Sequence, residues 1–107
     1  SALYEEVRKD VLEKLKGLAE EGIRKVCVYG RTPFTEGAML YLISEGIQVT
    51  AVYVDSIDGE GLFINRIPLR PISEFDGDCG VLVLMGPLPT EFEGQINTRR
   101  LVCYPVS

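Results

Sequence analysis

The chain of 107 residues contains no histidine. This absence removes the commonest general base and metal ligand, so a catalytic mechanism would have to rest on carboxylates, thiols or a cofactor. The sequence also has no apolar run near the roughly 20 residues that span a bilayer, and it has no signal-peptide pattern. We therefore expect a cytoplasmic protein that has no membrane partner.

The chain also has fewer basic than acidic residues. The chain has 11 lysines and arginines against 16 aspartates and glutamates, which gives a formal net charge of −5. A surface with this balance should repel a polyanion, so we do not expect this domain to bind nucleic acid directly.

Cysteine is scarce, and its spacing gives no indication of metal binding. The three cysteines, Cys27, Cys79 and Cys103, are odd in number and form no C-x-x-C motif. Cys27 and Cys103 lie in apolar, strand-like runs, which is typical of buried thiols in a reducing cytoplasm rather than of a redox or metal site. We expect Cys79 to be the most exposed thiol. We assign it no chemistry, because no basic residue adjoins it in the sequence.

The composition is that of one globular domain. Hydrophobic residues make up 46% of the chain and charged residues 25%, and the length is sufficient for a hydrophobic core. Because Ser1 and Ala2 stand where an initiator methionine is expected, we interpret residues 1–107 as a single domain excised from a longer protein. A processed complete chain is the alternative.

A strand–turn–helix pattern occupies residues 25–46. The apolar run of residues 26–29 stops at Gly30, and Pro33 opens a segment whose apolar residues recur at helical spacing. We expect a strand buried on both faces over residues 24–29. A helix should follow it, with Thr32 as N-cap and Pro33 as first residue, and should end at Gly46. This order is typical of the phosphate-facing corner of a Rossmann-type α/β fold.

An amphipathic helix is predicted ahead of this pattern, over residues 3–21. Gly22 is placed to end it, and its apolar stripe recurs every three or four residues: Leu3, Val7, Val11, Leu15 and Leu18. The stripe either packs on the sheet of its own chain, or it joins an upstream domain or a second protomer. The latter alternative predicts a homodimer through residues 3–18.

The rest of the chain supplies further strands, at residues 48–54, 81–85 and 101–106. Two prolines limit residues 67–70 to extended structure at a sheet edge, residues 73–77 offer at most one helical turn, and residues 89–98 form a loop or short helix. A helix–glycine–isoleucine–strand order occurs at residues 19–26 and again at 43–49, which predicts parallel strands with right-handed crossovers. The predicted fold is α/β, three-layered and Rossmann-like. Its mostly parallel sheet has four to five strands in the order 3-2-1-4-5, with flanking helices.

This order of elements resembles a known group, the small Rossmann-like, CoA-binding-type domains of bacteria. The resemblance covers residues 21–87 and rests on four segments, at residues 28–30 (VYG), 52–55 (VYVD), 67–69 (IPL) and 83–86 (VLMG). Such domains occur at the front of sugar acyltransferases that carry a left-handed β-helix, and in regulators beside a winged-helix DNA-binding domain. In the regulators a helix like that at residues 3–21 connects the two domains, so the resemblance favours a regulator.

The first turn departs from the pattern of that group, which usually has G-x-G followed three positions later by a small residue. Here Gly30 is kept, but Thr32 replaces the second glycine and Thr35 replaces the small residue. A β-branched residue adds bulk where a pyrophosphate would approach the backbone. A full dinucleotide site also needs about six strands, and at most five are predicted. We therefore do not expect classical NAD binding, and a nucleotide- or CoA-like ligand remains the interpretation.

The candidate ligand site consists of residues at the predicted strand ends. The turn at residues 30–35 offers a helix N-terminus, the charge of Arg31 and threonine hydroxyls to an anion; alternatively, its threonines only stabilise the turn. Asp55 lies where Rossmann proteins hold a ribose hydroxyl, although a strand-end carboxylate that caps the next turn is equally common. A second corner should form the opposite wall of a crevice. The candidate residues are Gly30, Arg31, Thr32, Pro33, Phe34, Thr35, Asp55, Gly86 and Pro87.

Two classes of function remain. The first is a non-catalytic regulatory or ligand-sensing domain of a larger bacterial protein, which binds a nucleotide-, CoA- or sugar-nucleotide-like ligand or has lost ligand binding and serves in assembly. The second is the cofactor- or substrate-binding domain of an enzyme such as a sugar acyltransferase. The missing histidine and the absence of a nucleophile–base pairing favour the first class.

Overall fold

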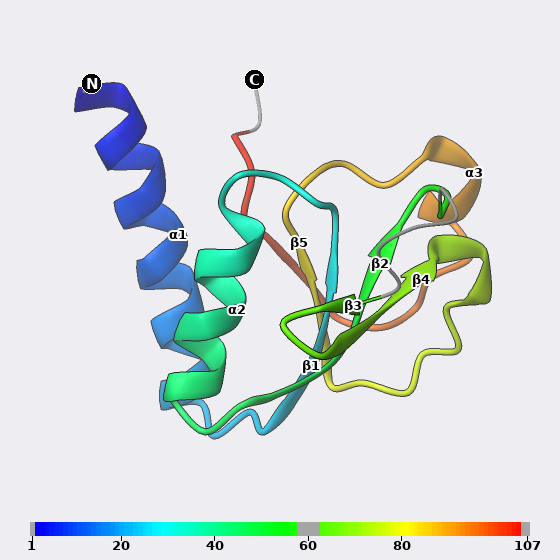
Figure 1. Ribbon diagram of the computed structural model, residues 1–107, viewed down its shortest axis with the longest axis horizontal. Coiled ribbons are helices and arrows are strands. Elements are labelled where there is room, and N and C mark those ends of the chain that lie inside the picture. Colours follow the sequence, from blue (N-terminus) through cyan, green and yellow to red (C-terminus); the bar gives the residue numbers. More distant parts are fainter. Residues whose placement is uncertain (1, 58–62, 106–107) are drawn as a thin grey trace.

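The computed structural model describes residues 2–57 and 63–105, and its centre is a twisted sheet (Figure 1). The strands lie in the order β3-β4-β2-β1-β5-β6. Five of them are parallel, and β3 adds an antiparallel edge to β4. Counted along the chain without β3, the parallel strands have the predicted order 3-2-1-4-5, so the Rossmann-like prediction is confirmed. The strands are β1 (Lys25–Tyr29), β2 (Gln48–Val54), β3 (Phe63–Ile64), β4 (Ile67–Pro71), β5 (Val81–Leu84) and β6 (Arg100–Val102).

The two central strands are buried because their sequences are continuous apolar runs. In β5 all four residues are buried, and in β1 only Lys25 is exposed. The two strands are in parallel register, with Val26 opposite Val81 and Tyr29 opposite Leu84. Parallel strands covered on both faces carry this kind of sequence, so both strand predictions are confirmed.

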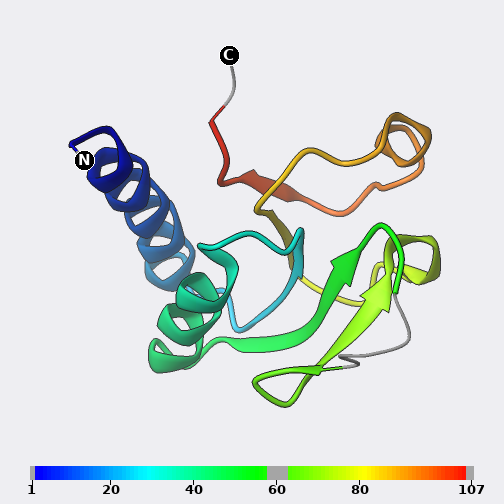
Figure 2. The ribbon, with the colours of Figure 1, turned by 45° about the horizontal axis from the view of Figure 1, so that its top comes forward.

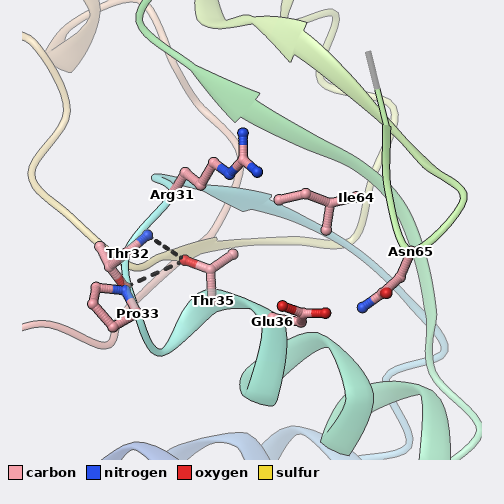
Figure 3. Close-up of a pocket in the computed structure, with 7 residues that line it drawn as sticks. All are labelled: Arg31, Thr32, Pro33, Thr35, Glu36, Ile64 and Asn65. Carbon is pink, nitrogen blue, oxygen red and sulfur yellow. Dashed lines mark hydrogen bonds between the residues drawn. The ribbon is translucent and has the colours of Figure 1, made fainter. Parts of the chain in front are cut away.

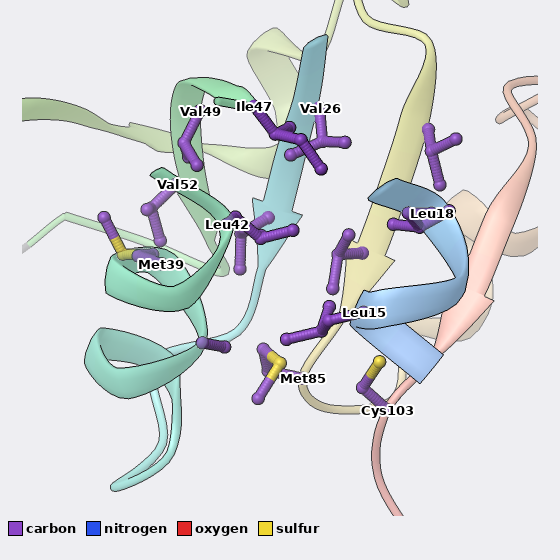
Figure 4. Packing of buried hydrophobic residues seen from close by; sticks show 14 of the residues in the cluster. Leu15, Leu18, Val26, Met39, Leu42, Ile47, Val49, Val52, Met85 and Cys103 are labelled. Atoms are coloured by element: carbon purple, nitrogen blue, oxygen red, sulfur yellow. The ribbon is translucent and has the colours of Figure 1, made fainter. Parts of the chain in front are cut away.

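Helices α1 (Ala2–Glu20) and α2 (Thr35–Ser44) lie on one face of the sheet (Figures 1 and 2). The helix predicted over residues 3–21 is thus observed. Val11, Leu15 and Leu18 are buried in the core between helices and sheet (Figure 4). This part of the apolar stripe packs on its own chain and is not available to a second protomer, and the homodimer stays a prediction.

Both helices end in the same way, which explains the repeated helix–glycine–isoleucine pattern. Gly22 and Gly46 have φ values of +83° and +79°. An isoleucine follows each glycine. The N–H of Ile23 donates to the carbonyl of Leu18 at 3.1 Å, and the N–H of Ile47 donates to the carbonyl of Leu42 at 3.0 Å. These are the bonds of the Schellman motif, in which glycine adopts the left-handed conformation at C′.

The opposite face of the sheet is covered by short elements and loops. A single 3-10 turn, η1 (Ile72–Glu74), and the one-turn helix α3 (Thr90–Glu93) lie there. Ile72 belongs to a hydrophobic cluster that also contains Tyr53 and Leu82 of the sheet, and Phe92 packs against this cluster. The helical turn predicted at residues 73–77 therefore exists, but it begins one residue earlier and ends at Glu74. The short helix considered for residues 89–98 also exists, with narrower bounds.

Two strand predictions need correction. The extended segment at residues 67–70 is not the sheet edge, because β3 pairs with β4 through a two-residue turn at Asn65 and Arg66, whose φ values are +47° and +69°. Left-handed residues at both positions match the twist of a tight hairpin, and no glycine marks the turn in the sequence. The last strand covers Arg100–Val102 rather than residues 101–106; of the predicted range, residue 106 lies outside the described part.

Candidate functional site

Two chain corners meet at the carboxyl ends of β1 and β5. Gly30 follows β1 with a φ of +100°, and a Cβ atom built on it would lie 3.0 Å from the amide nitrogen of Gly86. The N–H of Gly30 donates to the carbonyl of Tyr53 at 2.9 Å, and the N–H of Met85 donates to that of Tyr29 at 2.7 Å. Only glycine combines this conformation with so close an approach. The corners at Gly30 and Gly86 are therefore adjacent, as predicted for the point where the strand order reverses.

A crevice of about 470 Å³ opens at this junction. From here on it is called the crevice, and it is lined by Tyr29, Gly30, Arg31, Thr32, Val54, Asp55, Ser56, Gly86 and Pro87. Sequence reasoning named most of these residues but missed Tyr29, Val54 and Ser56. Only their position in the sequence could have indicated that they line the crevice, because each adjoins a predicted site residue at the end of a strand.

A smaller hollow of about 310 Å³ adjoins the crevice and shares Arg31 and Thr32 with it. Its other lining residues are Pro33, Thr35, Glu36, Ile64 and Asn65. Figure 3 shows Glu36 of α2 and Asn65 of the β3–β4 hairpin pointing toward one another across this hollow. Phe34, the remaining candidate, lines neither space and packs partly buried against the hydrophobic core.

The turn between β1 and α2 is tied together by threonine hydroxyls. The hydroxyl of Thr35, which is 1% exposed, donates to the carbonyl of Gly30 at 2.7 Å and accepts the N–H of Thr32 at 2.8 Å. The hydroxyl of Thr32 accepts the N–H of Phe34 at 3.2 Å. Such local side-chain bonds compete with helix formation.

These bonds overturn the predicted start of the helix. α2 begins at Thr35, with Phe34 at the N-cap position and no side-chain cap bond there. Thr32 is therefore not the N-cap, and Pro33 lies in the turn rather than at the first helical position. The reason is that both hydroxyls hold residues 32–34 in a turn of their own.

The same network occupies the backbone donors that a glycine-rich turn would offer to a pyrophosphate. The N–H groups of Thr32, Phe34 and Thr35 bond within the turn, and Pro33 has none. The charge nearest to this turn is the exposed guanidinium of Arg31, which forms no ion pair within the described ranges. Recognition of an anion here would depend on Arg31 more than on backbone.

Asp55, which also lines the crevice, is held by Tyr29. The hydroxyl of Tyr29 donates to Oδ1 of Asp55. Burial raises the pKa of Tyr29 far above its usual range, and the bond to Asp55 raises it further. The tyrosine thus remains a protonated donor. Asp55 lines the crevice, and within the described part of the chain no hydrogen bond or ion pair engages its Oδ2.

Three further findings bear on the site. In the part of the chain that the structure describes, no three His, Cys, Asp or Glu side chains gather closely enough to hold a metal ion. None of the helices described has the length and apolarity to cross a membrane. Comparison of the chain with the models of known protein families, with curated proteins and with solved structures found no match.

Proposed function

We propose that this domain is a non-catalytic, ligand-sensing part of a larger bacterial regulatory protein, and that its crevice takes a nucleotide-, CoA- or sugar-nucleotide-like ligand. The observation that carries the proposal is that Arg31 and Asp55, a cation and a fixed carboxylate, line one crevice at the reversal of strand order. Arg31 would pair with an anionic group of the ligand, and Oδ2 of Asp55 would accept a ligand hydroxyl. The volume of about 470 Å³ is within the usual range for small-molecule sites.

The turn geometry narrows the class of ligand. A dinucleotide is ordinarily held by backbone N–H groups at a glycine-rich turn, and here the threonines occupy those groups. This favours a ligand whose anionic group reaches Arg31 from the open side of the crevice, and it argues against classical NAD. A domain that has lost its ligand and serves in assembly would have the same turn, so the ligand has to be tested directly.

The alternative function is the cofactor- or substrate-binding domain of an enzyme such as a sugar acyltransferase. Tyr29 and Asp55 are the bonded pair of titratable groups in the crevice, and the pKa of Tyr29 is raised away from neutrality. A phenol in this state is a poor proton acceptor near pH 7, which favours binding over catalysis. The neighbouring domain would separate the two: hexapeptide repeats downstream favour the acyltransferase, and a winged helix upstream favours the regulator.

A thermal-shift screen with CoA, NAD, mononucleotides and UDP-sugars tests the proposal. A ligand at 100 times its Kd stabilises the folded state by about 2.7 kcal/mol, which raises the melting temperature of a domain of this size by several degrees. We expect such a shift with at least one mononucleotide, CoA-like compound or UDP-sugar and none with NAD. If no compound shifts the melting temperature, the ligand-binding proposal is wrong for these classes and the assembly role gains support.

Charge reversal locates the site. Arg31→Glu should abolish the shift produced by an anionic ligand, whereas Arg24→Glu, an exposed arginine next to the amino end of β1, should leave it unchanged. Asp55→Ala should remove the preference for a ribose over a 2′,3′-dideoxyribose ligand, because only a hydroxyl donates to the carboxylate. A response that is the same in Arg31→Glu and Arg24→Glu would place the site elsewhere.

A further inference from the structure

Two cysteines that are far apart in the sequence lie together on the loop-covered face of the sheet. Cys27, in the middle of β1, is 2% exposed. Cys79 precedes β5, is half-buried, and packs on the cluster that contains Cys27. Both thiols are free. This pair lies on the face opposite α1 and α2, away from the third cysteine.

Backbone pairing brings the two cysteines to each other. β1 and β5 are adjacent and parallel, with Cys27 opposite Leu82. Just ahead of β5, the N–H of Gly80 donates to the carbonyl of Lys25 at 3.2 Å, and a Cβ atom on Gly80 would lie 3.0 Å from that oxygen. The residue after Cys79 therefore lies against the backbone at the start of β1. The absence of a side chain at position 80 permits this close approach.

The two thiols lie close enough to change each other's pKa. A hydrogen bond from Cys79 lowers the pKa of the Cys27 thiol against the opposing effect of burial, and the hydroxyl of Thr50, 3.4 Å from its sulfur, lowers it further. The same hydrogen bond between the two thiols, together with burial, raises the pKa of Cys79. When the pair loses its first proton, the remaining one is shared between the sulfurs. The carboxylates of Asp76 and Asp78 oppose this ionisation.

We propose that Cys27 and Cys79 form an intramolecular disulfide when the domain meets a small peroxide. Cys79 is the sulfur that solvent reaches, so it attacks hydrogen peroxide first, after its proton has passed to the ionised sulfur of Cys27. An S–O bond forms at Cys79, the O–O bond breaks, and hydroxide leaves and becomes water with the proton that the pair had released to solvent. Cys27 then attacks the sulfenic acid: the S–S bond forms, the S–O bond breaks, and a second water leaves with the proton of Cys27. Two thiols and one peroxide give one disulfide and two waters.

Cys103 provides an internal control. It is 4% exposed and lies in the cluster beneath α1 and α2, on the other face of the sheet. Burial raises its pKa to about 11. A thiol that is buried and protonated reacts slowly with oxidants, so it should remain reduced while the pair reacts.

The test is peroxide treatment of the folded chain, followed by thiol alkylation, intact-mass measurement and peptide mapping. We expect a loss of two hydrogens and a linked peptide that joins residues 27 and 79 in the unmodified chain and in Cys103→Ser alike. One alkylatable thiol should remain in the oxidised unmodified chain and none in oxidised Cys103→Ser. Cys79→Ser, at the more exposed position, should keep the fold and lose the linkage, as should Cys27→Ser if its melting transition shows that it folds. A linkage through Cys103, a Cys79-linked dimer, or sulfinic acid at Cys79 without a disulfide would each overturn the proposal.

Discussion

The two faces of the sheet are built from different kinds of side chain. Beneath α1 and α2 the buried core is mostly aliphatic, with Leu15, Leu42 and Met39 entirely covered and Cys103 as its one buried cysteine. The opposite face carries tyrosine, cysteine and phenylalanine, including Tyr53, whose ring meets that of Phe75 edge-on at 5.2 Å. Long helices cover the first face, whereas loops and single turns cover the second.

Within β1, the residues that pack under the helices differ in kind from those on the loop-covered face. In β1, Val26 and Val28 belong to the helix-covered cluster, whereas Cys27 and Tyr29 belong to the loop-covered one. Successive residues of a strand point to opposite faces, so the strand delivers inert methyl groups to one side and groups that titrate or react to the other. Both proposals above depend on the second side.

The comparison predicts unequal costs for the same truncation on the two faces. Leu15→Ala, beneath the helices, should lower the free energy of unfolding by about 4 kcal/mol, and Leu88→Ala, on the loop-covered face, by about 2 kcal/mol. Leu15 is 0% and Leu88 5% exposed, so burial is nearly matched; the difference arises because loops can collapse into a cavity that rigid helices leave open. Urea denaturation measures both values, and equal costs would contradict the distinction between the faces.

The chain corner at Gly30, at the carboxyl end of β1, should be the position where a substitution next most lowers the free energy of unfolding. Gly30→Ala places a Cβ atom at a φ of +100° and 3.0 Å from the nitrogen of Gly86, and should cost about 3 kcal/mol through strain and displacement of the second corner. Gly37→Ala is the matched control, because it lies within α2 and a Cβ there meets nothing within 4 Å. That change should stabilise the domain by up to about 1 kcal/mol. A Gly30→Ala variant as stable as the unmodified chain would show that the corners separate easily.

Much of the fold could be predicted from sequence because its signals are local. The stripe at Val11, Leu15 and Leu18, the glycines that end both helices, and the apolar runs of β1 and β5 each identify an element without knowledge of its neighbours. The β3–β4 hairpin was missed because Asn65 and Arg66 adopt left-handed conformations without glycine. Nothing in the residue types distinguishes this turn from a loop.

The site was predictable in outline and not in its contacts. Gly30, Asp55 and Gly86 follow strands, and parallel strands bring their carboxyl ends to one edge. The bond from Tyr29 to Asp55 and the contact of Cys27 with Cys79 depend instead on which side chains share a face across neighbouring strands. The Cys27–Cys79 contact also depends on the path of the loop before β5, which no local pattern specifies.

Loss of the threonine hydrogen bonds in the turn between β1 and α2 should lower the free energy of unfolding by an intermediate amount. Thr35→Val keeps the shape of the side chain but removes the hydroxyl that donates to the carbonyl of Gly30 and accepts the N–H of Thr32. Leaving these two groups without partners next to the buried side chain of residue 35 should cost about 2 kcal/mol. Thr90→Val, an exposed threonine at the start of α3, should change stability by no more than about 0.5 kcal/mol. Equal effects of the two substitutions would mean that the turn does not depend on its hydroxyls.

Tyr29→Phe should have the smallest effect at neutral pH, about 1 kcal/mol, because the exposed carboxylate of Asp55 regains water when it loses the tyrosine hydroxyl. The effect should depend on pH. The pKa of Tyr29 is raised in the folded state, so its contribution to stability is complete below the unfolded value near about 10 and is lost as pH rises above it.

Tyr53, whose pKa burial raises to about 12, acts in the same direction. The free energy of unfolding should therefore fall between about pH 9 and about pH 11 in the unmodified chain, less steeply in Tyr29→Phe, and least in a variant that also carries Tyr53→Phe. Urea denaturation across this range measures the slopes. Because both tyrosines lie on the loop-covered face, identical slopes in all three proteins would show that this face does not make the stability of the domain dependent on pH.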